Sequence, residues 1–409
     1  MFKQIILDNQ ELIKNIKILE RDYEFYYDLL LLKKIVSFVG PRRTGKTFLM
    51  YSFVKQLIKK GKIELEQVVF IDFSMYSGLE LDSNHLLKNY KELFPNKTPF
   101  FVFDEIQDIS NFKNFVLSLY NKQFQIFLSG SNSNLLSSEL TTHFRGRIFQ
   151  YNILPLTFNE VLRFNNIEYK NYYSTTEKVK LSNILKETLE YGSFPEIVLS
   201  KNNIFKIDNL KTYLDILIYK DLLERYKIDN EFSLRYLIKS LTLGFTKQVN
   251  INKIYNELKS QNIKIGKTTL YEYYQYIKNI FYIFEVENYF SQKGSKECFL
   301  YNLGFNKLLG NKLNYGQSFE NLIFIELKKK YDKIYYKKNG SEIDFFIEEK
   351  KINIQVCYEL NLSNLQREIK PFLKSEGENI LIYNSIENGL NIPENINIEV
   401  ISFMDFIGK

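Results

Sequence analysis

Eight residues near the N-terminus constrain the fold of this chain more than any other segment does, and they read Gly40-Pro41-Arg42-Arg43-Thr44-Gly45-Lys46-Thr47. They follow an apolar segment, 35–39, that predicts a strand, and they precede an amphipathic segment, 48–60, that predicts a helix. The spacing GxxxxGK followed by Ser or Thr, between a strand and a helix, is typical of a loop whose backbone wraps closely around phosphates.

The chemistry of such a loop follows from its residue types. Backbone N–H groups and the start of the following helix supply positive potential for an anion. We expect Lys46 to reach the β- and γ-phosphates and Thr47 to place its hydroxyl on Mg²⁺. All eight residues, Gly40–Thr47, are therefore candidates for binding a nucleoside triphosphate. The alternative is a chance match on a glycine-rich turn.

A second segment, Phe100-Phe101-Val102-Phe103-Asp104-Glu105, places two acidic residues at the end of a predicted buried strand. Open α/β sheets bind ligands at the carboxyl ends of their strands. We expect Asp104 to hold Mg²⁺ through water, and Glu105 to polarise the attacking water as general base. The alternative is a solvated acidic pair that ends a strand.

Further polar residues follow a third apolar stretch, 126–128. Ser131 or Asn132 is predicted to touch the γ-phosphate or to position the water, unless these residues cap the next helix.

Downstream, Arg145 and Arg147 are candidates for an arginine finger, with Arg147 favoured and with a surface ion pair as the alternative. The segment 121–124, Asn-Lys-Gln-Phe, lacks the aspartate that guanine recognition needs, so adenine is the expected base.

Alternation of strands and helices predicts an α/β fold with a parallel sheet in the N-terminal part. Its further strands are predicted at 67–73, 100–103 and 125–128, and residues 1–34 read as helical. Helical spacing dominates from about 157 to 280, and strands return at 334–336, 343–347, 352–356 and 380–383.

The bulk properties limit the function classes. The 409 residues imply two to four domains, and the net charge of +7 permits nucleic-acid binding without requiring it. Cys298 and Cys357 form no CxxC pair, which argues against zinc or a disulfide framework. We expect a cytoplasmic protein without a secretion signal or a membrane partner, because the N-terminus is charged throughout and no run of about 18 apolar residues occurs.

The order of these segments resembles that of AAA-type prokaryotic ATPases that carry a C-terminal domain of unknown function. The resembling N-terminal segments are GPRRTGKT, FFVFDEIQDI, FLSGSNSNLL and FRGRIFQYNILPLTFNE. The resembling later segments are YGSFPEIVL (191–199), LYNLGFNKLLG (300–310), GQSFENLIFIEL (316–327) and SEIDFFIEEKKINIQVCYEL (341–360). The resemblance covers nearly the whole chain and implies a Mg²⁺-dependent ATPase whose hydrolysis moves a C-terminal interaction domain.

The same resemblance implies two modules in the C-terminal half. The first is similar to a winged helix-turn-helix, with helices at 251–258 and 267–274 and a turn at 261–266. Lys267, Thr268 and Thr269 would then face DNA. Because the second helix has few basic residues and many tyrosines, a module for protein contacts is the alternative.

The second implied module is similar to the PD-(D/E)XK nuclease fold, in which carboxylates and a lysine hold Mg²⁺ and activate water. The matching positions are Glu320, Asp344 (with Glu342 as a further acid beside it), Gln355 and Cys357. Gln355 replaces the usual acid and Cys357 replaces the usual lysine. We therefore expect a nuclease-like fold without catalysis.

Together these readings predict an ATPase domain at 1–155, a helical lid or linker at 156–235, a winged-helix module at 236–295 and a nuclease-like domain at 296–409. The expected cofactors are ATP and Mg²⁺, and the expected partners are DNA, another protein or further copies of the chain. Two other functions stay open: a nuclease gated by ATP, and a nucleotide-dependent switch or scaffold with little turnover.

Overall fold

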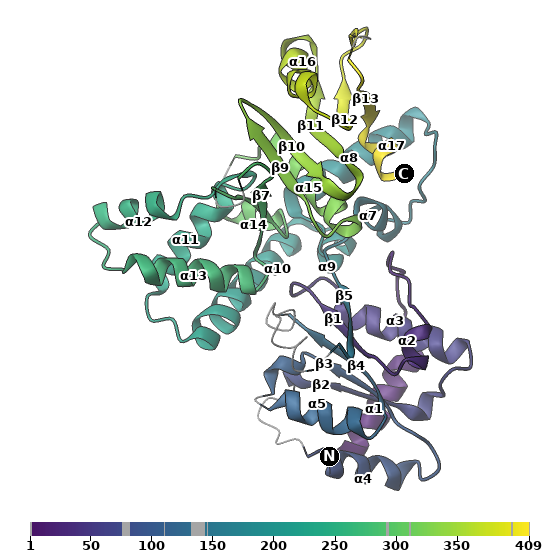
Figure 1. The fold of residues 1–409 in the computed structure, drawn as a ribbon. Helices are drawn as coiled ribbons and strands as arrows, with labels where there is room; N and C mark the ends of the chain where they lie inside the picture. Colours follow the sequence, from purple (N-terminus) through teal and green to yellow (C-terminus); the bar gives the residue numbers. More distant parts are fainter. Residues whose placement is uncertain are drawn as a thin grey trace. The chain divides into compact units, whose positions relative to one another are not determined.

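The computed structural model of the chain describes residues 2–75, 82–109, 111–131, 144, 146–291, 294–310, 312–393 and 396–408. The chain divides into two compact units (Figure 1), one of residues 1–154 with 279–281, the other of residues 155–278 with 282–409. The first boundary lies at Leu154–Pro155, beside the predicted end of the ATPase domain.

The first unit contains a five-stranded sheet in the order β2-β3-β4-β1-β5, in which every neighbouring pair is parallel. Its strands are β1 (Ile35–Val39), β2 (Val68–Asp72), β3 (Phe100–Asp104), β4 (Gln125–Gly130) and β5 (Ile148–Asn152). Its helices are α1 (Phe2–Asn15), α2 (Asp28–Leu31), α3 (Lys46–Lys59), α4 (Ser83–Leu93) and α5 (Phe112–Asn121). The predicted parallel-sheet α/β architecture is confirmed.

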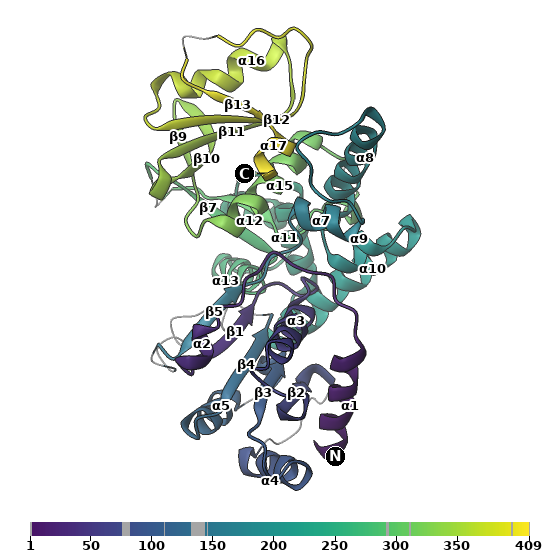
Figure 2. The ribbon, with the colours of Figure 1, turned by 90° about the vertical axis from the view of Figure 1, so that its right-hand side faces the viewer.

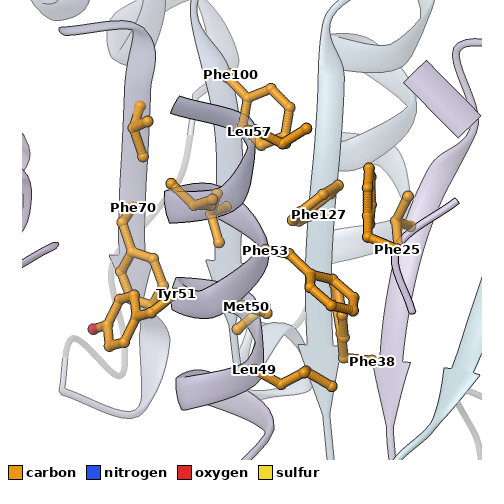
Figure 3. Close-up of a cluster of buried hydrophobic side chains, with 14 of the residues drawn as sticks. Phe25, Phe38, Leu49, Met50, Tyr51, Phe53, Leu57, Phe70, Phe100 and Phe127 are labelled. Atoms are coloured by element: carbon orange, nitrogen blue, oxygen red, sulfur yellow. The ribbon is translucent and has the colours of Figure 1, made fainter. Parts of the chain in front are cut away.

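Alternating side chains on these strands bury both faces of the sheet. On one face, Phe53 of α3 packs against Phe38 of β1 with ring centroids 5.7 Å apart, and Phe38 in turn packs against Phe127 of β4 (Figure 3). On the other face, Phe103 of β3 packs against Phe115 of α5 at 5.3 Å. This double packing fixes the carboxyl ends of β1, β3 and β4 relative to one another.

The two edge strands of this sheet are protected differently. Helix α1 runs along β2 (Figure 2), where Asn9 and Gln10 donate to the outward carbonyl oxygens of Phe70 and Val68. Strand β5, on the other edge, is only partly buried and carries polar residues. Its sequence, IFQYN, therefore lacks a clear strand pattern, and sequence reasoning did not predict it.

The expectation that residues 1–34 are helical is wrong for 16–27, which lie outside α1 and α2. Tertiary contacts hold this segment: Phe25 is buried in the core, Lys55 donates to the carbonyl of Ile16, and Tyr151 donates to the carbonyl of Glu24. Packing against the rest of the unit therefore overrides helix propensity here.

The second unit begins with helices and continues into a mixed sheet. Its helical segments are α7 (Phe158–Phe164), α8 (Thr175–Tyr191), α9 (Pro195–Leu199), α10 (Asn203–Ile216), the π-helical Leu217–Glu224, α11 (Glu231–Leu243), α12 (Ile251–Ser260), α13 (Lys267–Asn279), α14 (Gly304–Leu308), α15 (Tyr315–Lys330), α16 (Leu362–Ile369) and α17 (Phe403–Gly408). Its strands are β6 (Lys247–Gln248), β7 (Ile283–Asn288), β8 (Glu297–Leu300), β9 (Tyr335–Asn339), β10 (Ser341–Ile347), β11 (Ile352–Leu360), β12 (Glu378–Ile386) and β13 (Glu399–Ser402).

These strands join in one sheet, ordered β13-β12-β11-β10-β9-β7-β8-β6. Strands β11, β12 and β13 are parallel, β9–β10–β11 and β6–β8–β7 are antiparallel, and a short parallel pairing of β7 with β9 links the two halves. Helix α15, which is buried on all sides along most of its length, packs on β11. Among the described residues, no helix is long and apolar enough to cross a membrane.

Candidate functional site

The loop Gly40–Thr47 leaves the carboxyl end of β1 and leads into α3. At Gly40 an added Cβ would lie 2.0 Å from the carbonyl oxygen of Ile153, so only glycine fits between the loop and the end of β5. Gly45 has φ +86°, in the left-handed region where glycine is least strained. The sequence motif therefore meets both backbone demands of a tight phosphate-binding loop.

Lys46 is folded back over this loop. Its side chain is 4% exposed, and its Nζ donates to the carbonyl oxygens of Gly40 (3.1 Å) and Pro41 (2.9 Å). The same Nζ lies 3.8 Å from a carboxylate oxygen of Glu105. A buried ammonium group is thus held inside the loop, where it can meet a phosphate charge.

Asp104 ends β3 directly opposite this loop. The hydroxyl of Thr47 donates to Asp104 Oδ2 at 2.5 Å, and the hydroxyl of Ser129, on β4, donates to Asp104 Oδ1. Burial, followed by the charge of Glu105, raises the pKa of Asp104. Mg²⁺ prefers oxygen ligands. The Thr47 hydroxyl and the buried Asp104 carboxylate are such ligands and are in contact, so these residues fit the expected ion.

Glu105 adopts a left-handed backbone conformation, with φ 49°. Such a conformation is costly for a residue with a side chain, and strained residues of this kind cluster at functional sites. The backbone N–H of Glu105 donates to Ser129 Oγ at 3.0 Å, and the side chain of Gln107 donates to a carboxylate oxygen of Glu105 at 2.5 Å. These two contacts set the direction of the Glu105 side chain.

The electrostatic surroundings keep Glu105 ionised. Its burial would by itself raise its pKa, but the charges of Lys46 and then Arg42, together with hydrogen bonds from Gln107 and Ser131, lower that pKa below its usual value. An ionised carboxylate beside the loop has the protonation state that a general base requires. Arg43 is exposed on the loop and has φ 66°.

The side chain of Gln107 also donates to Ser131 Oγ at 3.3 Å, which places Ser131 beside Glu105. The predicted neighbour Asn132 and the alternative finger Arg145 lie outside the described residues. Sequence reasoning missed Ser129 and Gln107, which bind the two carboxylates directly. Ser129 and Gln107 both lie beside the predicted motifs. Their position just at or after the end of a strand was the sequence feature that could have identified them.

Arg147 lies at the opposite edge of the sheet from the loop. Its carbonyl oxygen accepts from the N–H of Ile35, the first residue of β1, whereas the loop follows the last residue of that strand. The five residues of β1 separate the two positions by roughly 15 Å. The guanidinium group lies 5.3 Å from the ring centroid of Tyr120 on α5. The structure thus contradicts a finger that acts on the site of its own chain.

A second group of chemically active side chains lines a cavity of about 650 Å³ in the second unit. The structure brings together Glu320 on α15, Asp344 on β10, and Gln355 and Cys357 on β11, the four positions that the resemblance matched. It adds Glu368 on α16, which accepts from Gln355 Nε2 at 3.2 Å; Gln355 Nε2 also donates to Asp344, at the same distance.

The electrostatics of this cavity differ from those of the loop. Burial, followed by the charges of Asp344 and Glu297, raises the pKa of Glu320, and burial is also the largest cause of the raised pKa of Asp344. Burial raises the pKa of the Cys357 thiol to about 12, so the thiol is protonated and inert. Among the described residues, no group of three or more His, Cys, Asp or Glu side chains is arranged to hold a metal ion.

Comparison with known proteins agrees with the site in the first unit. Residues 32–162 match the family described as "AAA domain", and residues 182–299 match a "Domain of unknown function (DUF8612)". The uncharacterized protein MJ1544 of Methanocaldococcus jannaschii is 36% identical over 417 residues, which cover 99% of this chain and 89% of that protein. An uncharacterized protein of Haemophilus influenzae is 26% identical over 391 residues, 91% of this chain and 94% of that protein.

Among solved structures, the Walker-type ATPase PABY2304 of Pyrococcus abyssi aligns with a TM-score of 0.42 and 14% identity, over 73% of this chain and 99% of that chain. The sequence match to the M. jannaschii protein is both closer and nearly complete. This chain therefore belongs to the family of that archaeal protein, and its N-terminal unit contains an AAA-type P-loop ATPase domain.

Proposed function

We propose that this protein is a Mg²⁺-dependent ATPase whose ATP binding and hydrolysis drive a conformational change of its C-terminal unit. One observation carries the proposal: the Thr47–Asp104 hydrogen bond and the Lys46–Glu105 ion pair lie together at the carboxyl edge of the sheet. The Thr47–Asp104 pair is suited to hold a cation. Beside it, Lys46 is suited to bind phosphate, and Glu105 to accept a proton from water.

In this proposal each residue has one role. The loop N–H groups and Lys46 bind the phosphates, and Thr47 and Asp104 hold Mg²⁺, which when bound neutralises charge on the β- and γ-phosphate oxygens. Glu105 accepts a proton from the attacking water, and Gln107 and Ser131 orient its carboxylate. The lowered pKa of Glu105 supports this role, because the carboxylate is free to accept a proton near neutral pH.

Arg147 completes the site only from another copy of the chain. Its position at the amino edge of the sheet keeps it away from its own loop, but an edge residue can reach the site of a neighbouring molecule. We therefore propose an oligomer in which Arg147 neutralises transition-state charge on ATP bound by the adjacent subunit.

The proposal is tested by separating binding from turnover. Glu105→Gln keeps the shape and the contact with Gln107 but removes the base, so we expect ATP affinity close to that of the wild type and turnover slower by roughly 10²–10⁴-fold. Calorimetric binding and phosphate release measure the two quantities. The control is Glu11→Gln, at an exposed position on α1. Wild-type turnover by Glu105→Gln would rule out Glu105 as the base.

The partner of the C-terminal unit is proposed more broadly. The elements α11–β6–α12–α13–β7–β8 follow the order expected of a winged helix, and Lys267 and Thr268 are exposed at the start of α13. Lys259 and Lys264 line an open pocket of about 720 Å³ beside them. These features support contact with DNA; a protein contact is the alternative, and a rate of ATP hydrolysis that duplex DNA does not change would favour it.

The division of the second unit into lid, winged-helix and nuclease-like parts stays a proposal. The nuclease gated by ATP is less well supported, because Gln355 and Cys357 supply neither the acid nor the lysine. The switch with little turnover is less well supported because Glu105 is present, ionised and oriented.

A further inference from the structure

One arginine joins the phosphate-binding loop to the end of the first unit. Arg21 lies in the non-helical segment between α1 and α2 and is half-buried. One guanidinium nitrogen donates to the carbonyl oxygen of Thr44 at 2.7 Å, and the other donates to the carbonyl oxygen of Leu154 at 3.0 Å. Thr44 belongs to the loop, and Leu154 is the residue after which the second unit begins.

The contact at Thr44 bears directly on phosphate binding. The carbonyl of Thr44 and the N–H of Gly45 belong to the same planar trans peptide, so they point in opposite directions. A donor that holds the carbonyl on one side therefore fixes the direction of the N–H on the other side. The hydroxyl of Thr44 donates to the carbonyl of Pro41 at 2.9 Å and holds the loop from within. Arg21 thereby orients a loop N–H without touching a phosphate.

The contact at Leu154 is supported by its neighbours. The hydroxyl of Tyr23 accepts from the N–H of Leu154 at 3.0 Å and donates to the carbonyl of Asn152 at 3.1 Å. The N–H of Ile153 donates to the carbonyl of Val39, the last residue before the loop, at 2.7 Å. The chain that leaves β5 is thus tied to the loop before it enters the second unit at Pro155.

We propose that Arg21 is a positioning residue that couples the orientation of the Gly45 N–H to the backbone at Leu154. A rotation of the Thr44–Gly45 peptide on binding or losing a phosphate changes the Arg21 contact, and the shared guanidinium passes that change to Leu154 and along the covalent chain to Pro155. The planar, two-pronged guanidinium suits this role, because a lysine ammonium cannot span two carbonyls in fixed geometry. The inference rests on the proposed ATP binding and adds how the bound state reaches the second unit.

The test compares Arg21→Lys with wild type and with Tyr23→Phe, each checked first for an unchanged melting temperature. Arg21→Lys keeps the charge but loses the two-carbonyl bridge, whereas Tyr23→Phe loosens Asn152 and Leu154 without touching Thr44. Two quantities are measured in Mg²⁺: the dissociation constants of ATP and ADP, and the ATP-dependent change in hydrogen exchange of peptides that cover 40–48 and 150–160.

For Arg21→Lys we expect ATP affinity to weaken by roughly 3–10-fold, the equivalent of one hydrogen bond. We also expect the ATP-dependent change at 150–160 to disappear while a change at 40–48 remains. For Tyr23→Phe we expect ATP affinity within about 2-fold of the wild type. Arg21→Ala serves as a second variant, and if it folds it should match or exceed the loss in Arg21→Lys.

Two failures are distinguishable. If the wild type does not bind ATP, both the proposed function and this inference are overturned. If the wild type binds ATP, and Arg21→Lys shows the same affinity and the same exchange change at 150–160, only the inference is overturned. An affinity loss in Tyr23→Phe equal to that in Arg21→Lys would also overturn it, because the effect would then come from the junction and not from the Thr44 contact.

Discussion

Two groups of carboxyl side chains lie in this protein, and they differ in what faces them. At the loop, Glu105 lies beside Lys46 and Arg42, and the two cations hold its pKa below the usual value. In the second unit, Asp344 and Glu320 line the cavity together with Gln355, Cys357, Glu368 and Arg367, and the nearby Glu297 adds a further negative charge. Burial, then the charges of Glu342 and Asp344, raises the pKa of Glu297 to about 8.

Residue type alone therefore does not set the chemistry of a buried acid. Desolvation disfavours the charged form at both places. At Glu105 the charges of Lys46 and Arg42 outweigh it, whereas at Asp344 and Glu297 the opposing charges of Arg367 and Lys338 do not. The loop thus presents an ionised carboxylate, and the pKa values of Asp344 and Glu320 in the cavity are raised.

The largest expected effect is at Lys46, the cation that sets the loop apart. Lys46→Ala removes the buried charge that meets the phosphates and also the charge that keeps Glu105 ionised. We expect ATP affinity to fall by more than about 100-fold, as for a lost charge-assisted contact, and turnover to reach background. If calorimetry shows that Lys46→Ala binds ATP as tightly as the wild type does, Lys46 does not bind the phosphates.

The next effect concerns Arg147, the cation that we propose a neighbouring copy supplies. Arg147→Ala should slow turnover by roughly 10²-fold while ATP affinity changes little, because the guanidinium acts on transition-state charge. Wild-type specific activity should rise with protein concentration. Mixing Arg147→Ala with Lys46→Ala should restore activity, since the second variant donates an intact arginine to the intact loop of the first.

A mixture that stays inactive, together with a specific activity independent of concentration, would count against an arginine supplied by a second copy. Arg163→Ala, at an exposed arginine of the second unit, is the matched control and should leave turnover unchanged.

A smaller effect concerns the cavity and its pH dependence. The raised pKa of Glu297 means that the folded state binds its proton more tightly than the unfolded state does, so the stability it contributes is present below about pH 4.5 and is lost as the pH rises to about 8. Glu297→Gln cannot ionise. We therefore expect it to raise the melting temperature at about pH 8.5 by roughly 2–4 °C for each 1 kcal/mol recovered.

The same variant should differ little from wild type near pH 5, where both side chains are neutral in the folded state. Calorimetry at the two pH values measures this, with Glu359→Gln, at an exposed position, as control. A Glu297→Gln protein that gains the same stability at both pH values would show that the benefit is not electrostatic.

The last prediction is that the cavity of the second unit does not cleave DNA. Because Cys357 occupies the position at which the nuclease pattern has a lysine, and burial raises the pKa values of Asp344 and Glu320, we expect no Mg²⁺- or Mn²⁺-dependent cleavage of plasmid or single-stranded DNA, with or without ATP. Asp344→Ala is the comparison. Cleavage by the wild type that disappears in Asp344→Ala would overturn the contrast and place the nuclease function first.

The loop, the acidic pair and the parallel-sheet class could all be predicted from the order of the amino acids alone. Gly40, Lys46 and Thr47 are spaced by the geometry of one turn, and Asp104 and Glu105 follow an unmistakable buried strand. Each motif is encoded within a few neighbouring residues, so its chemistry can be recognised without knowing which parts of the chain meet. The strands predicted at 334–336 and 343–347 overlap β9 and β10 for the same reason.

Which distant side chains face one another could not be predicted in this way. The tertiary structure places Arg147 at the amino end of β1, leaves residues 16–27 non-helical, and adds Glu368 to the acids of the cavity. It also brought Arg21 to Leu154, which is 133 positions away in the sequence. Such contacts depend on how strands and helices pack across the whole unit, and no local spacing encodes them. Through-space neighbours therefore set the pKa values of Glu105 and Asp344 and keep Arg147 away from the loop of its own chain.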